Sequence, residues 1–166
     1  MSPKSVNTVI ALGSLLISST AFAGHTNHVV STQLSADHLV GTMGDADGHG
    51  HAHVFGVDGN PTTLCYVLQV SDIQTVPVGD GMAAHIHEAA AGSNGSPIAM
   101  LAGPEDGDAA DCLTEGEKGK FPTGEAGIVK RILENPQQFY INVHNPEYPA
   151  GAIRGQLQAA EHDHGM

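Results

Sequence analysis

The sequence predicts an all-β domain, a sandwich or barrel, with one short helix. Short segments that are rich in β-branched and apolar residues recur along most of the chain, which is typical of strands. Turn sequences rich in Gly, Pro, Asn and Asp separate them about every ten residues, a spacing typical of all-β domains. Apolar residues at helical spacing occur only at residues 125–134, and no internal repeat is visible.

We expect strands at residues 28–34, 37–43, 51–57, 62–70, 82–87, 98–101, 138–143 and 152–157. The Asp-Gly pair at residues 58–59, followed by Pro61, predicts a tight turn and therefore a hairpin of 51–57 with 62–70. Residues 103–121 are acidic and rich in glycine, and we expect an irregular loop there. The helix is expected over 125–134, with Thr123 as its cap and the Asn-Pro pair at 135–136 ending it.

The first residues have the pattern of an export signal. Lys4 precedes an apolar run at residues 9–17, and the small residues Ala-Phe-Ala follow at 21–23. The run is shorter than the about 20 residues that a membrane-spanning helix needs. We therefore expect a signal peptide at 1–23, a His-containing tail at 24–33, one domain at 34–158 and a second His-containing tail at 159–166. The expected location is periplasmic or extracellular.

The chain is strongly acidic, with six Lys and Arg residues against 18 Asp and Glu residues and a net charge of −12. Such a charge repels nucleic acids and anionic lipids and attracts cations. We therefore expect a metal ion as partner and no nucleic acid, and no protein partner is predicted.

Cys65 and Cys112 are the two cysteines of the chain. An even number of cysteines in an exported protein predicts a disulfide, which would close a loop of 48 residues. The alternative is that they are thiolate ligands of a metal. We expect the disulfide, because neither cysteine lies beside a histidine.

His85 and His87 lie two residues apart in the strand expected at 82–87. Because side chains alternate along a strand, both imidazoles point to one face. His144 follows the apolar strand at 138–143 and offers a third imidazole. Three such rings can bind one ion with nitrogen–metal distances of about 2 Å. The alternative is a pair that only forms hydrogen bonds at a strand end, since a His-x-His sequence is common.

His49, His51 and His53 also alternate. They form either a second group of metal ligands, a source of a fourth ligand for the first site, or a solvated polar face of an edge strand. Arg154, in the last expected strand, either binds an anion or pairs with a carboxylate such as Glu88, and we expect the pairing.

Several sequence blocks together resemble the CHRD domain, a module named from chordin and widespread in exported bacterial proteins. They are Ala-His-Ile-His-Glu at residues 84–88, Gly-Ser-Asn-Gly-Ser-Pro at 92–97, Asn-Pro at 135–136, Phe-Tyr-Ile-Asn-Val-His at 139–144 and Tyr-Pro-Ala-Gly-Ala-Ile-Arg-Gly-Gln-Leu at 148–157. The similarity covers about residues 34–157. It implies a Greek-key β-sandwich or barrel similar to that of Cu/Zn superoxide dismutase.

A weaker likeness to the Cu/Zn superoxide dismutases themselves would place His85, His87 and His144 at three copper-ligand positions and Arg154 at the anion-guiding position. That family also needs a bridging histidine and a zinc loop. No histidine occurs between residues 88 and 143, so a dinuclear site is not expected.

The sequence therefore favours an exported protein that binds a transition metal, copper before zinc, for metal buffering, delivery or tolerance. The first alternative is a mononuclear copper enzyme similar to superoxide dismutase, with Arg154 beside the metal. The second is a structural or adhesion module without metal. The chain contains no sequence motif for a nucleophile, a phosphate-binding loop or a catalytic Cys–His pair.

Overall fold

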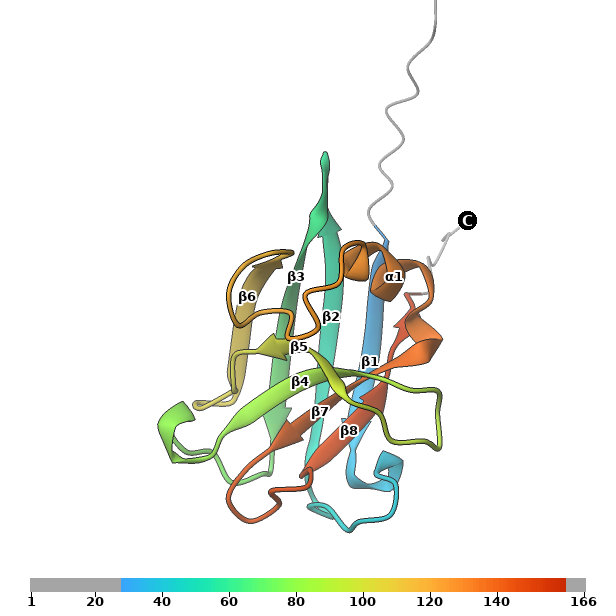
Figure 1. Cartoon of the computed structure of the whole chain (residues 1–166). Coiled ribbons are helices and arrows are strands. Elements are labelled where there is room, and N and C mark those ends of the chain that lie inside the picture. The colour runs from blue at the N-terminus through green and yellow to red at the C-terminus, as the bar shows by residue number, and fades with distance from the viewer. Residues whose placement is uncertain (1–27, 161–166) are drawn as a thin grey trace, which may run out of the picture.

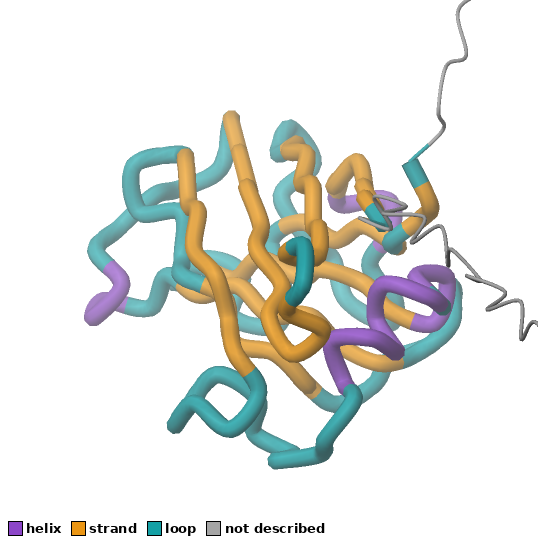
Figure 2. The backbone as a smooth tube through the Cα atoms, turned by 90° about the horizontal axis from the view of Figure 1, so that it is seen from above, coloured by secondary structure: helices purple, strands orange, loops and turns teal. Residues whose placement is uncertain are grey.

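The computed structural model of the protein describes residues 28–160. Its strands are β1 (Val29–Ser35), β2 (His49–Val57), β3 (Asn60–Ser71), β4 (Ala83–Glu88), β5 (Pro97–Leu101), β6 (Asp108–Thr114), β7 (Phe139–His144), β8 (Ile153–Gln156) and β9 (Gln158–Ala159). They form one antiparallel sheet in the order β5-β4-β7-β8-β1-β2-β3-β6, and β9 pairs with β1. The sheet curls so that β4, β7 and β8 cross in front of β1, β2 and β3 (Figures 1 and 2). The expected all-β fold with one short helix is confirmed.

Alternation along the strands separates the core from the outer face of the barrel. In β7, Phe139, Ile141 and Val143 are fully buried in the hydrophobic core. Tyr140 and Asn142 point to the opposite face but are still only 2% and 6% exposed. Strand β7 is therefore buried on both faces. Burial of the outer face of the barrel creates a polar environment with little access to water, and the histidines of the sequence lie in it.

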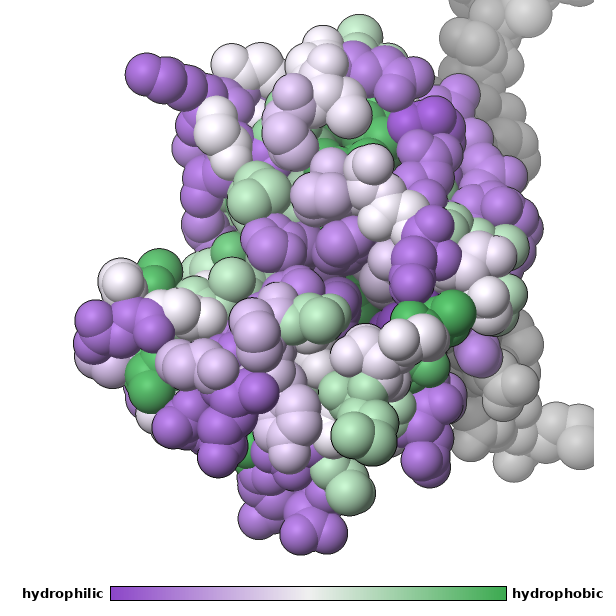
Figure 3. Space-filling view, turned by 60° about the horizontal axis from the view of Figure 1, so that its bottom comes forward, coloured by the Kyte–Doolittle hydropathy of each residue, from purple (hydrophilic) through white to green (hydrophobic). Residues whose placement is uncertain are grey.

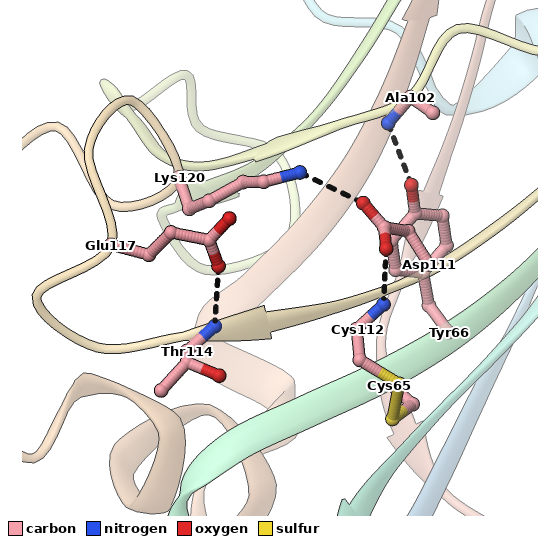
Figure 4. Close-up of polar contacts among 8 residues, drawn as sticks. All are labelled: Cys65, Tyr66, Ala102, Asp111, Cys112, Thr114, Glu117 and Lys120. Atoms are coloured by element: carbon pink, nitrogen blue, oxygen red, sulfur yellow. Dashed lines mark hydrogen bonds and ion pairs between the residues drawn. A yellow bond between two sulfur atoms is a disulfide. The ribbon is translucent and has the colours of Figure 1, made fainter.

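The two edges of the sheet, at β5 and β6, are both joined to β3 (Figure 4). Cys65 of β3 lies directly opposite Cys112 of β6, and the two form the expected disulfide. The hydroxyl group of Tyr66 accepts a hydrogen bond from the backbone N–H of Ala102, just beyond β5, at 2.6 Å. A single residue pair of β3 therefore joins edge strand β6 by a covalent bond and the end of edge strand β5 by a hydrogen bond.

Two predicted elements are wrong. Residues 37–43 do not form a strand, because a short 3-10 helix (Ala36–His38) is followed by a loop in which Gly41 has a positive φ of 73°. Residues 103–121 are not wholly irregular, because they contain β6, which pairs with β3. Only Leu113 of β6 is buried, so this edge strand lacks the apolar alternation by which strands are found.

The helix α1 (Ile128–Glu134) begins three residues later than expected. Gly127 precedes it with a φ of 81°, a left-handed conformation that starts the helix there. The carboxylate of Glu115 accepts hydrogen bonds from the N–H groups of Gly127 and Val129, which satisfies donors that Thr123 was expected to satisfy. The predicted end before Pro136 is confirmed.

The folded part includes β1 from Val29, within the segment 24–33 that we expected to be a tail. The expected signal peptide and the histidines at positions 25, 162 and 164 lie outside the described residues. Across residues 28–160, the structure contains no helix with the length and apolar character needed to cross a bilayer.

Gly155 of β8 provides a test of the barrel packing. A Cβ atom at this position would overlap the backbone oxygen of Gln33 and the hydroxyl oxygen of Thr32, both in β1. We expect Gly155→Ala to lower the free energy of unfolding by about 1–3 kcal/mol, because the backbone of β1 would have to move. Urea denaturation at pH 7 measures this change.

Gly79→Ala is the matched control for this prediction. Among the described residues, no atom outside its chain neighbours lies within 4 Å of a Cβ placed on Gly79, and its φ is not positive. Its free energy of unfolding should change by less than about 1 kcal/mol. Equal effects of the two substitutions would contradict the close approach of β8 to β1.

Candidate metal centre

The register of β4 against β7 places three histidines on one face of the sheet. The two strands are antiparallel, with Ala83 opposite His144 and His85 opposite Asn142. Because side chains alternate, His85, His87 and His144 all point to the outer face, and His144 lies diagonally across from His85. One ligand atom from each of the three residues lies within 4.8 Å of the other two. The structure thus brings together the three imidazoles that the sequence places on two strands.

Two of the rings are oriented by backbone carbonyl groups. Nδ1 of His87 donates a hydrogen bond to the carbonyl oxygen of Gly95 at 2.9 Å, and Nδ1 of His144 donates to that of Pro149 at 3.1 Å. These bonds place the proton on Nδ1 and leave a lone pair on Nε2 of each ring, as in metal-binding histidines. Both Nε2 atoms are buried and have no hydrogen-bond partner among the described residues. A metal ion is a partner that would satisfy both.

The environment keeps the three imidazoles neutral. Burial lowers the pKa of His85, His87 and His144 below the usual value for histidine, and it is the largest cause in each case. For His85, the positive charges that His144 and His87 would carry add to this effect, and the pKa falls to about 4. The neutral form is the one that binds metal, so the centre loses no affinity to protons at neutral pH.

An aromatic ring and a buried cation support the centre from one side. The ring of Tyr140 stacks on that of His87, with centroids 4.8 Å apart and an interplanar angle of 11°. The guanidinium of Arg154 lies over the Tyr140 ring, 3.4 Å from its centroid. Arg154 is only 2% exposed and donates hydrogen bonds to the side-chain oxygen of Asn94 and the backbone oxygen of Ser93.

The expected pairing of Arg154 with Glu88 is therefore wrong. Glu88 instead lies 3.2 Å from Arg131 of α1. Burial lowers the pKa of Arg154, but a guanidinium keeps its proton at neutral pH. The positive charge of Arg154 thus stays beside the histidines.

A pocket of about 360 Å³ gives access to the centre. Its walls include His87, His144, Asn142 and Arg154, together with residues 39–42 of the loop before β2. The loops of this end of the barrel carry a mostly hydrophilic surface with scattered apolar residues (Figure 3). The site is therefore suited to a small polar ligand. Three neutral imidazoles suit copper or zinc and leave a further coordination position open.

Comparison with known families places this site in a recognised domain. A family model described as the CHRD domain matches residues 30–157, which include all three histidines and Arg154. The chain belongs to the CHRD domain family. A search of curated proteins gave no match for this CHRD protein, and a search of solved structures gave none. The weaker likeness to Cu/Zn superoxide dismutases thus stays a prediction.

The other alternating histidines of the CHRD domain lie elsewhere. His49, His51 and His53 are on the outer face of β2, and the rings of the last two are 6.0 Å apart. Nε2 of His49 is 2.8 Å from the hydroxyl oxygen of Ser71. Across residues 28–160, none of these three joins the group formed by the β4 and β7 histidines. A fourth ligand from β2 thus has no support in the geometry.

Sequence reasoning missed several neighbours of the CHRD histidines. Tyr140 and Asn142 share a strand face with His144, so alternation along residues 139–144 was a signal that could have found them. The carbonyl groups of Gly95 and Pro149 come from irregular loops. Backbone carbonyls carry no residue type, and no sequence signal could have found those two.

The lowered pKa values predict how the metal-free CHRD domain responds to acid. In the unfolded chain the histidines protonate near pH 6.5, whereas in the folded domain they resist protonation. The unfolded state therefore binds more protons below that pH, and the free energy of unfolding should fall as the pH drops from about 6.5 toward about 4. Urea denaturation of chelator-treated protein at a series of pH values measures this dependence.

His85→Gln is the matched variant for the acid response, since glutamine is polar but does not titrate. We expect a shallower fall in the free energy of unfolding between the same pH limits. Identical pH dependence in the two proteins would contradict the lowered pKa of His85.

Proposed function

We propose that this CHRD protein is exported and binds one transition-metal ion, copper in preference to zinc, through His85, His87 and His144. The observation that carries the proposal is the convergence of three imidazole ligand atoms within 4.8 Å of one another. The role would be buffering, delivery or tolerance of the metal in the periplasm or outside the cell.

The donor set and the charge of the protein support copper. Imidazole nitrogen binds both copper and zinc, and at a given site copper(II) binds more tightly than zinc(II). The net charge of −12 raises the concentration of cations near the surface. Tyr140, stacked on His87, and the carbonyl groups that hold two rings keep the site ordered before metal arrives, which lowers the entropic cost of binding.

Two further features support export. The N-terminal residues have the signal pattern described above, with cleavage expected after Ala23. Cys65 and Cys112 form a disulfide, which is typical of oxidising compartments. We also propose that His-containing tails flank the domain, which in the structure begins with β1 at Val29, before the expected boundary at residue 34.

One observation favours a second candidate function, a mononuclear copper enzyme similar to superoxide dismutase. The pocket that reaches His87 and His144 is also lined by Arg154, whose positive charge would attract a small anion. Such an enzyme needs an open position on the metal, which three protein ligands would leave. Superoxide-dependent turnover by the copper-loaded protein distinguishes this enzyme from a binding protein.

Calorimetric titration with copper(II) tests the proposed site. We expect the wild type to bind one ion per chain. In His85→Ala/His87→Ala we expect the affinity to fall by more than about 100-fold, because removing metal ligands lowers the affinity more than removing the hydrogen-bond partners that orient them. The same titration with zinc(II) measures the preference between the metals, and circular dichroism verifies that the variants fold.

His51→Ala/His53→Ala is the matched control, since it removes a His-x-His pair of the same spacing from β2. This control should keep the wild-type affinity. Unchanged affinity in the β4 variant, or an equal loss in the β2 variant, would discard the site and favour a module in which the histidines only pack.

A further inference from the structure

The side-chain amide of Asn142 is a part of the centre to which the three-histidine site assigns no role. Asn142 lies in the middle of the outer face, opposite His85 of β4 on one side and Arg154 of β8 on the other. It is 6% exposed, and its Nδ2 donates a hydrogen bond to the carbonyl oxygen of Ala150 at 3.4 Å. Its Oδ1 is buried and has no hydrogen-bond partner among the described residues.

The backbone holds this amide in place. Gly151 packs directly against it, so that a Cβ on Gly151 would lie 2.6 Å from Oδ1 and 2.9 Å from Nδ2 of Asn142. Gly151 also has a φ of 135°, which favours glycine. Leaving a buried acceptor without a donor is unfavourable, whereas an apolar side chain of the same size would avoid this cost. The arrangement therefore indicates that a donor reaches Oδ1 when the site is in use.

A bound molecule can supply the donor, because no hydrogen-bond donor of the described residues reaches Oδ1 of Asn142. Asn142 lines the same pocket as His87 and His144. The cation nearby, Arg154, directs two of its five N–H groups to Asn94 and Ser93, and among the described residues none of its N–H groups reaches Oδ1 of Asn142. Nδ1 of each of the two lining histidines donates to a loop carbonyl group. A small molecule in the pocket is thus the source of the hydrogen-bond donor to Oδ1 of Asn142 that the neighbouring side chains do not supply.

We propose that this pocket holds an exchangeable water ligand of the metal ion and that Oδ1 of Asn142 accepts a hydrogen bond from it. The inference rests on the proposed function. Three imidazoles leave an open position on the ion, and a metal-bound water is a strong hydrogen-bond donor. Asn142 is a positioning residue in this arrangement, because it holds the water and not the metal.

Water-proton relaxation of the full chain titrated with copper(II) tests this inference, because an exchangeable water on paramagnetic copper shortens the proton relaxation time. Copper stoichiometry is measured on the same samples. We expect Asn142→Leu to bind one copper per chain and to lose at least about twofold in relaxivity, since leucine offers no acceptor. Asn142→Asp keeps an acceptor oxygen and should retain the wild-type relaxivity.

Thr42→Val is the control, because Thr42 lines the same pocket and its hydroxyl group donates to the backbone oxygen of Met43. It should leave the relaxivity unchanged. Wild-type relaxivity in Asn142→Leu, or loss of copper from both Asn142 variants, would overturn the role of Asn142. Absence of copper uptake by the wild type would instead overturn the proposed function itself.

Discussion

The structure depends on the register between β4 and β7. Pairing of Ala83 with His144 brings the end of β7 beside the histidine pair of β4. A shift of one residue would move every side chain of a strand to the other face and would send the imidazole of His144 into the core. The apolar neighbours of the histidines prevent such a shift, because Ile86 and Val143 are fully buried on the opposite face. The same alternation thus builds the core and aligns the three histidines proposed as metal ligands.

Loops that bury the outer face of the sheet orient the histidine rings and keep them neutral. Loops that contain Gly95 and Pro149 fold over the sheet and supply carbonyl groups to the rings. The same loops exclude water, which lowers the pKa values of the three histidines. Polar atoms of His87, His144 and Asn142 are left without hydrogen-bond partners among residues 28–160. Such a face is costly in a metal-free protein and becomes favourable when an ion and its ligand occupy it.

Much of the fold could be predicted from the sequence, because local patterns determine it. The hairpin around Gly59, the strand that carries His85 and the disulfide of Cys65 with Cys112 follow from turn residues, alternation and cysteine number. Strand β6 could not be predicted, because an edge strand with one buried residue lacks the pattern.

The candidate site could be predicted only in part. The convergence of the histidines from two strands was expected from their spacing. The stacking of Tyr140, the partners of Arg154 and the covering carbonyl groups depend on contacts between loops far apart in the sequence, which no local pattern encodes.

X-ray absorption at the copper edge of the loaded protein shows whether β4 and β7 together bind one ion. We expect three imidazole nitrogens at about 2.0 Å, with the outer-shell scattering of three rings. A first shell with sulfur, or with scattering from fewer than three imidazoles, would contradict the claim that β4 and β7 together bind a single ion.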